Sequence, residues 1–225
     1  MLRTVLTVTA AAAATCVLAA CGPVQLGAAA IIGSQRISAA QLTNQVTELQ
    51  ATLRAAHGRV QIQFPPSQAP QEVLSWLLRF GVRERMAERN HLTVTPEESQ
   101  RALAAIAAQV RAGGGGEPLY LLAAANGLPP GMLPELGRYQ AIQDALIARL
   151  DGGTLPASPA AQQALGQRVS HEQCLAAKSL DIRVNPQFGR LDYSQISVIP
   201  AAATLSAPEV PTPSPTPRPQ LTPAC

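Results

Sequence analysis

Aromatic residues are scarce in this chain. One Trp, three Tyr and three Phe occur among 225 residues, which is 3% of the total. With only three Met as well, the sequence offers no obvious adaptable apolar surface of the kind that promiscuous binding proteins use. The formal charge of +3 is scattered, and no basic stripe is interleaved with aromatic residues. This pattern argues against nucleic-acid binding.

Metal-binding and catalytic patterns are also missing. The four cysteines form no Cys-x-x-Cys pair, and His57, His91 and His171 stand far apart and far from the cysteines. No Ser-His-Asp order, Cys-His pair or paired-carboxylate motif stands out. The run Gly113 to Gly116 lacks the Gly-Lys-Ser/Thr ending of a phosphate loop. We therefore expect no catalytic residue, no metal and no cofactor.

The first 20 residues predict export. Arg3 precedes roughly 16 apolar or small residues, which suits a signal peptide and is shorter than the about 20 residues of a membrane-spanning helix. The ending Leu18-Ala19-Ala20-Cys21 resembles the lipobox of bacterial lipoproteins. That resemblance implies that residues 1–20 are removed and that lipid chains on Cys21 anchor the exported protein to the bacterial cell membrane, facing outward. The alternative is an ordinary secretory signal that ends near a cysteine.

Weakly patterned segments flank a central part of the chain. Residues 21–30 are small and predict a spacer, and residues 201–225 alternate Pro with small polar residues and predict a disordered tail. The folded domain is then expected over residues 31–200. Export also permits disulfides, and a bridge from Cys174 to Cys225 would close a loop of about 50 residues, worth on the order of 4 kcal/mol. A buried Cys174 with a free Cys225 is the alternative.

Helical periodicity dominates the central part. Ser38 is expected to cap a helix whose apolar residues follow a spacing of four, three and four: Leu42, Val46, Leu49 and Leu53. The segment from Ala69 to Asn90 predicts a second helix, the most buried one, with the stripe Val73, Trp76, Leu77 and Phe80. Its charged end is expected to form a solvated face, made of Arg83, Glu84, Arg85, Glu88 and Arg89.

The following segments predict four more helices. Thr95, Pro96 and Glu98 have the spacing of a capping box with Pro at the first helical position, and the glycines after residue 112 end that helix. A short helix is expected over residues 117–125. A longer helix that ends at Gly152 carries an apolar face of Leu136, Tyr139, Ile142, Leu146 and Leu150. The last helix is expected from Pro159 to Ala177.

Strand signals occur only at the two ends of this helical set. Short β-branched runs broken by turn residues make up "AAIIGSQRIS" near the start, and "LDIRVNPQFGRLD" and "SQISVIP" near the end. We expect Ile31 and Ile32 to pair with residues near Ile182 to Val184 or near Leu191. The fold class is therefore mainly α, closed by a small β-sheet from the N- and C-terminal segments.

The order of these motifs carries a resemblance. "AAIIGSQRIS", the tryptophan-bearing helix, "VTPEES", "GLPPGMLPELGRYQAIQDAL" and "RVNPQFGRLD" together resemble the N-terminal domain of SurA-type periplasmic chaperones, over about Ala28 to Asp192. Lipid-anchored proteins of the same kind occur in bacteria with GC-rich genomes. Many relatives have Arg where Gln187 stands. The resemblance implies a multi-helix SurA N-terminal-like fold and the binding of unfolded or partly folded exported polypeptides.

Prolyl isomerase activity is not expected. SurA-type proteins often carry parvulin domains of about 100 residues, and only about 25 residues separate Leu150 from Leu175 here. A partner-docking or structural lipoprotein that keeps the fold without general chaperone activity is the alternative function. The residues nominated for peptide binding, each of which also suits a core, are Trp76, Leu77, Phe80, Leu121 and Leu122.

Overall fold

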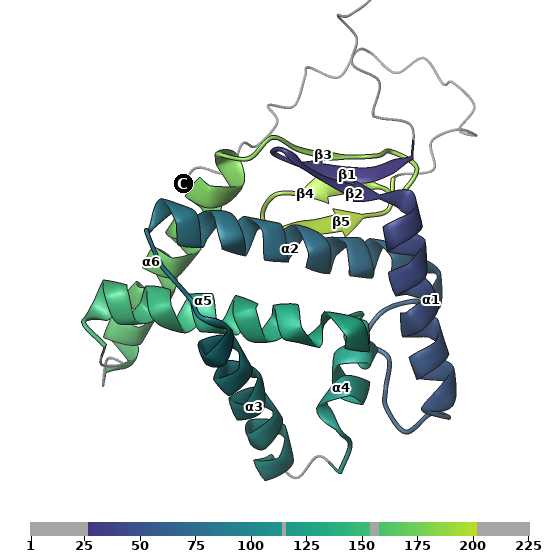
Figure 1. The fold of residues 1–225 in the computed structure, drawn as a ribbon, viewed down its shortest axis with the longest axis horizontal. Coiled ribbons are helices and arrows are strands. Elements are labelled where there is room, and N and C mark those ends of the chain that lie inside the picture. Colours follow the sequence, from purple (N-terminus) through teal and green to yellow (C-terminus); the bar gives the residue numbers. More distant parts are fainter. Residues whose placement is uncertain (1–26, 114–115, 154–157, 202–225) are drawn as a thin grey trace, which may run out of the picture.

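The computed structural model describes residues 27–113, 116–153 and 158–201. Within these residues the chain forms six α-helices and five short strands (Figure 1). The helices are α1 (Ala39–Ala55), α2 (Ala69–Arg89), α3 (Pro96–Ala112), α4 (Leu119–Ala125), α5 (Leu133–Asp151) and α6 (Pro159–Lys178). The strands are β1 (Ala28–Ile32), β2 (Gln35–Ser38), β3 (Ile182–Val184), β4 (Arg190–Asp192) and β5 (Ser197–Ile199). The prediction of a mainly helical domain with a small antiparallel sheet is confirmed.

The two ends of the domain meet in a three-stranded antiparallel sheet of order β2-β1-β3. Ile31 lies opposite Arg183 and Ile32 lies opposite Ile182, which confirms the expected long-range pairing. Asn185 extends the contact, because its backbone N–H donates to the Ala29 carbonyl at 2.9 Å and its side-chain amide donates to the Ala28 carbonyl at 3.0 Å. Strand β1 is thus held by residues about 150 or more positions further along the chain.

The structure decides between the two expected pairings and corrects one boundary. Leu191 does not pair with β1, because it lies in a separate two-stranded hairpin, β4–β5. The domain begins before residue 31, since Ala28, Ala29 and Ala30 are in β1 and at most 1% exposed. Their small side chains gave the sequence the appearance of a spacer, but small side chains also allow a strand to pack closely against its neighbours.

Helix α2 is the centre of the domain (Figure 1), with nine buried residues along its length. One side of α2 faces the strands and the other faces α5. The contact with the sheet is tight at Gly81, where an added Cβ would lie 2.9 Å from a methyl carbon of Ile32. The expectation that this helix is the most buried one is confirmed.

The β4–β5 hairpin is fixed to α2 by a buried hydroxyl. Ser75 is 1% exposed, and its Oγ donates to the Gln71 carbonyl at 2.7 Å and accepts from the Val198 N–H at 2.8 Å. Val198 and Ile196 are buried beside it. A polar atom without partners would be costly at this depth, so the two hydrogen bonds make the position compatible with a core.

The helix boundaries follow the local signals in the sequence. The Ser38 hydroxyl accepts from the Gln41 N–H at 3.0 Å, and Thr95 and Glu98 form a capping box at the start of α3. Gly152 follows α5 with φ of 69°, a left-handed conformation that favours glycine. Among the described helices, none is both long enough and apolar enough to cross a membrane.

Candidate functional site

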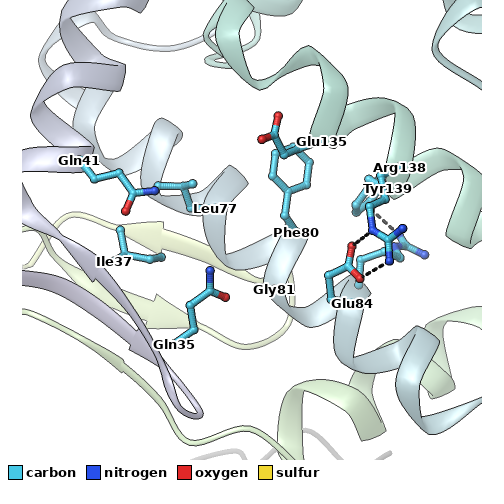
Figure 2. A pocket seen from close by; sticks show the side chains of 11 residues that line it. Gln35, Ile37, Gln41, Leu77, Phe80, Gly81, Glu84, Glu135, Arg138 and Tyr139 are labelled. Carbon is cyan, nitrogen blue, oxygen red and sulfur yellow. Dashed lines mark hydrogen bonds and ion pairs between the residues drawn. The ribbon is translucent and has the colours of Figure 1, made fainter. Parts of the chain in front are cut away.

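A cavity of about 230 Å³ lies where β2, α1, α2 and α5 come together (Figure 2). In the figure, Gln41 and Leu77 lie on one side, the pair Glu84 and Arg138 lies on the other, and Phe80 stands between them. The lining residues are Gln35, Ile37, Gln41, Leu77, Phe80, Gly81, Arg83, Glu84, Glu135, Arg138 and Tyr139. The cavity therefore combines an apolar wall with amide and charged groups.

The apolar wall belongs to a series of ring contacts that runs from α2 to α5. The rings of Trp76 and Phe80 are 5.8 Å apart, and those of Phe80 and Tyr139 are 5.9 Å apart in an edge-to-face arrangement. Trp76 is held at the other end, because its Nε1 donates to the Asn126 carbonyl at 3.0 Å. Aromatic pairs at these distances prefer tilted or edge-on geometry, so the contacts fix the orientation of Phe80 in the cavity wall.

Arg83 departs from the expected solvated face of α2. The residue is only 4% exposed, and its guanidinium carbon lies 4.0 Å from the ring centroid of Tyr139. One guanidinium nitrogen, Nη2, donates to the Tyr139 hydroxyl. Arg83 follows Phe80 by three residues on the helix and therefore continues its face into the core. The sequence-based expectation treated it with its charged neighbours and was wrong for this residue.

Glu84 and Arg138 form an ion pair at one end of the cavity. Arg138 donates from Nε at 2.5 Å and from Nη2 at 2.8 Å to the two Glu84 oxygens, and from Nη1 to the Val94 carbonyl at 3.1 Å. The hydrogen bonds to Glu84 raise the pKa of the Arg138 guanidinium above its usual value. All three guanidinium nitrogens of Arg138 thus donate within the protein, and the Glu84 carboxylate balances the positive charge.

A second, more open groove of about 440 Å³ adjoins this cavity between α3 and α5. Glu135 and Arg138 line both spaces, and the groove adds Pro96, Ser99, Gln100, Leu103 and Pro134. The helices approach closely beside it, since a Cβ on Gly137 would lie 2.5 Å from the Ser99 carbonyl oxygen and 2.9 Å from the Leu103 Cβ. The two spaces share Glu135 and Arg138, and their lining residues come from four helices, α1, α2, α3 and α5.

The structure separates the five residues nominated for peptide binding. Leu77 and Phe80 line the cavity, and Trp76 contacts Phe80 without lining it. Leu121 is 1% exposed in α4, so a bound polypeptide could not touch it without a rearrangement. Leu122 is half-buried and lines neither space.

The sequence did not lead to the prediction of several of the lining residues. Gln35 and Ile37 are two apart on β2, and the period of a strand places them on one face. Arg83 could have been found from its helical spacing to Phe80. The pairing of Glu84 with Arg138 joins residues 54 positions apart, and a single sequence gives no sign of such a contact.

Cys174 and the three histidines are not among the residues that line the cavity. Cys174 is disulfide-bonded, while Cys21 and Cys225 lie outside the described residues, so the lipid attachment and the bridge to Cys225 stay predictions. His57, His91 and His171 are exposed. Over residues 27–113, 116–153 and 158–201, no three His, Cys, Asp or Glu side chains are grouped as a metal site would require.

Comparison with known proteins adds no assignment. No family model, curated protein or solved structure matches the chain.

Proposed function

We propose that this protein is an exported, lipid-anchored lipoprotein with a SurA-like chaperone domain, which binds segments of unfolded or partly folded exported polypeptides without catalysis. The observation that carries the proposal is the cavity in which half-buried Leu77 and Phe80 lie beside the amides of Gln35 and Gln41. An apolar wall with a few amide and charged groups suits a polypeptide, because side chains and backbone amides present the same mixture.

The cavity by itself is large enough for only one or two side chains. Its volume of about 230 Å³ is below the roughly 300 to 1,000 Å³ of typical small-molecule sites. The adjoining groove continues past Glu135 and Arg138 to Leu103. An extended segment could place one or two residues in the cavity and continue along the groove.

A docking role for one specific envelope partner is the second candidate, and the rigidity of the walls favours it. The ring contacts around Phe80 and the bidentate pair of Glu84 and Arg138 hold the lining in one arrangement. General chaperones use surfaces that can repack around different clients. A cavity with fixed walls would bind only those polypeptide segments whose sequence matches its shape and charge.

Suppression of aggregation separates these two functions. The full chain, carried in lipid nanodiscs, is mixed with several unrelated unfolded proteins, and light scattering is recorded against empty nanodiscs. A holdase suppresses scattering of all clients at near-stoichiometric amounts. A docking protein leaves scattering unchanged and is crosslinked in cells to one envelope protein. If neither result is obtained, polypeptide binding is rejected.

Two substitutions link the activity to the cavity. Leu77→Gln places a polar group in the apolar wall and should weaken suppression severalfold. Ile62→Gln is the matched control, because Ile62 is 38% exposed and lies outside both lined spaces. Equal activity of the two variants would move the binding surface away from the cavity.

A further inference from the structure

The outer face of the three-stranded sheet carries a row of two arginines around one isoleucine. Ile31 of β1 lies opposite Arg36 of β2 and opposite Arg183 of β3, and residues paired in this way point to the same face of a sheet. The next residue, Ile32, lies against Gly81 of α2 on the other face. Successive side chains of a strand alternate between the two faces, so the row points away from α2.

Both arginines of the row are accessible. Arg36 is exposed, and the side chain of Arg183 is 55% exposed. Arg does not lose its proton in proteins, so both positions carry a positive charge. Asp181 pairs with Arg183 at 3.0 Å and is itself 67% exposed, and an ion pair that is this open to water is weak. Arg183 can therefore exchange this carboxylate for another anion, and the two positive charges and one negative charge leave one net positive charge on this face.

The row lies close to the point where the predicted lipid tether enters the domain. Gly27 is the first described residue, and its carbonyl accepts from the Ala39 N–H at 2.8 Å. The Arg36 guanidinium lies beside it, because a Cβ on Gly27 would be 3.4 Å from Arg36 Nη2. Since six positions separate Gly27 from Cys21, a lipid on Cys21 would keep this end of the sheet within about 22 Å of the bilayer.

The charges next to the tether favour contact with an anionic bilayer. Between Cys21 and Glu48 the only charged residue is Arg36. Anionic phospholipids attract each nearby Lys or Arg about fivefold, and this attraction fades within a Debye length of about 8 Å. Two such charges are too few to recruit a protein from solution. Lipid chains on Cys21 would supply the attachment, so the charges only need to determine which face of the domain turns toward the bilayer.

We propose that the outer face of the β2-β1-β3 sheet docks on anionic phospholipid headgroups of the membrane that holds the anchor. Arg36 and Arg183 donate to phosphate oxygens, and Ile31 lies between them at the headgroup boundary. This inference rests on the lipid anchor of the proposed function. Helix α2 lies between the sheet and α5 (Figure 1), so docking turns the groove between α3 and α5 away from the bilayer. The proposed polypeptide site then stays open to exported chains while the domain rests on the membrane.

Paramagnetic relaxation in nanodiscs tests this orientation. The lipidated full chain is placed in nanodiscs that contain a gadolinium-chelating lipid, and NMR measures how strongly the amide signals of Ser34 and Val184 in the sheet region are broadened relative to those of α3. This ratio should be severalfold higher in nanodiscs that contain phosphatidylglycerol than in pure phosphatidylcholine, and high salt should remove the difference. An equal ratio in the two lipids would overturn the proposal.

Substitution of the row tests the assignment to these residues. Arg36→Gln/Arg183→Gln should lower the ratio in anionic nanodiscs to its value in phosphatidylcholine. Arg101→Gln/Arg111→Gln is the matched control, because both residues are exposed on α3, at the end of the domain opposite the sheet (Figure 1). This variant loses the same two charges and should keep the ratio of the unaltered protein. Equal loss in both variants would reject the docking face, since a general charge effect would explain it.

The outcomes separate this inference from the proposed function. If the chain carries lipid and protects clients from aggregation but the ratio does not depend on the headgroup, only the docking face is rejected. If the mass of the protein shows no lipid, the anchor and the docking face are both rejected, while client protection still decides on polypeptide binding. Should Arg36→Gln/Arg183→Gln fail to fold, the comparison of the two lipids with the unaltered protein still decides.

Discussion

Deletion of the first two strands should unfold the domain. We compare a chain that begins at Gly27 with one that begins at Ala39, which lacks β1 and β2. The deletion removes Ile32 and Ile37, which are 4% and 2% exposed, and their burial is worth about 1.5 to 3 kcal/mol each. The three buried alanines of β1 add about 0.8 kcal/mol for each methyl group.

These losses amount to roughly 5 to 8 kcal/mol, against the about 5 to 15 kcal/mol that stabilises a typical domain. The β1–β3 pairing and the two hydrogen bonds from Asn185 are lost as well. Thermal unfolding followed by circular dichroism at 222 nm should show a cooperative transition for the longer chain. The chain from Ala39 should melt far lower or show no transition. Equal melting temperatures would refute the conclusion that the terminal sheet completes the core.

A pair of substitutions tests the same point without deletion. Ile32→Ala should destabilise the domain by about 2 to 5 kcal/mol, because Ile32 is buried against α2. Each kcal/mol lowers the melting temperature by about 2 to 4 °C for a domain of this size. Ile31→Ala is the control: Ile31 points to the other side of the strand and is half-buried, so its loss should be smaller.

The remaining predictions concern the anchor, the disulfide, catalysis and pH. Cys21→Ala should move the protein from the membrane fraction and remove the mass added by the lipid; continued membrane attachment would contradict the lipobox. Mass mapping under non-reducing conditions should find Cys174 joined to Cys225, and a free Cys225 would contradict the bridge. In an assay of cis/trans isomerisation at the bond before proline in a peptide, the protein should not accelerate the reaction, which takes tens to hundreds of seconds without a catalyst. The Thr95 N–H donates a hydrogen bond to the Glu98 carboxylate and thereby lowers the pKa of this carboxyl. The ionised carboxylate therefore stabilises the fold above about pH 4.3, and this stabilisation is lost as the pH falls through the lowered pKa. The melting temperature of Glu98→Gln should therefore lie below that of the unaltered protein at pH 7, and the difference should shrink as the pH falls through the lowered pKa of Glu98.

Local signals predicted the helices well. The caps at Ser38 and Thr95 and the glycine after α5 are properties of a few adjacent residues, and each fixes one boundary. The β1–β3 pairing was also predictable, because only the terminal segments carried strand patterns and strands need partners.

Long-range details were less accessible. The alanines 28–30 are small enough to suit either a spacer or a buried strand, and their pairing with β2 and β3 and the Asn185 contacts decide between the two. Arg is usually a surface residue, yet Arg83 is buried, because it lies about one turn after Phe80 on the same face of α2. The cavity itself depends on Tyr139 and Arg138 in a helix more than 50 residues further along, which no local pattern places there.

The closure of the fold and the proposed site are coupled through β2. Gln35 and Ile37 line the cavity, and β2 is held only by its pairing with β1 among the described strands. About seven residues separate Cys21 from Ala28, so a lipid on Cys21 would keep β1 within about 25 Å of the membrane even with a fully extended linker. A short tether of this kind raises the effective concentration of the site at the membrane surface and limits its reach elsewhere. With Cys21 lipidated as proposed, the binding site would encounter chiefly exported chains close to the membrane surface, where the apolar side chains of unfolded segments are accessible.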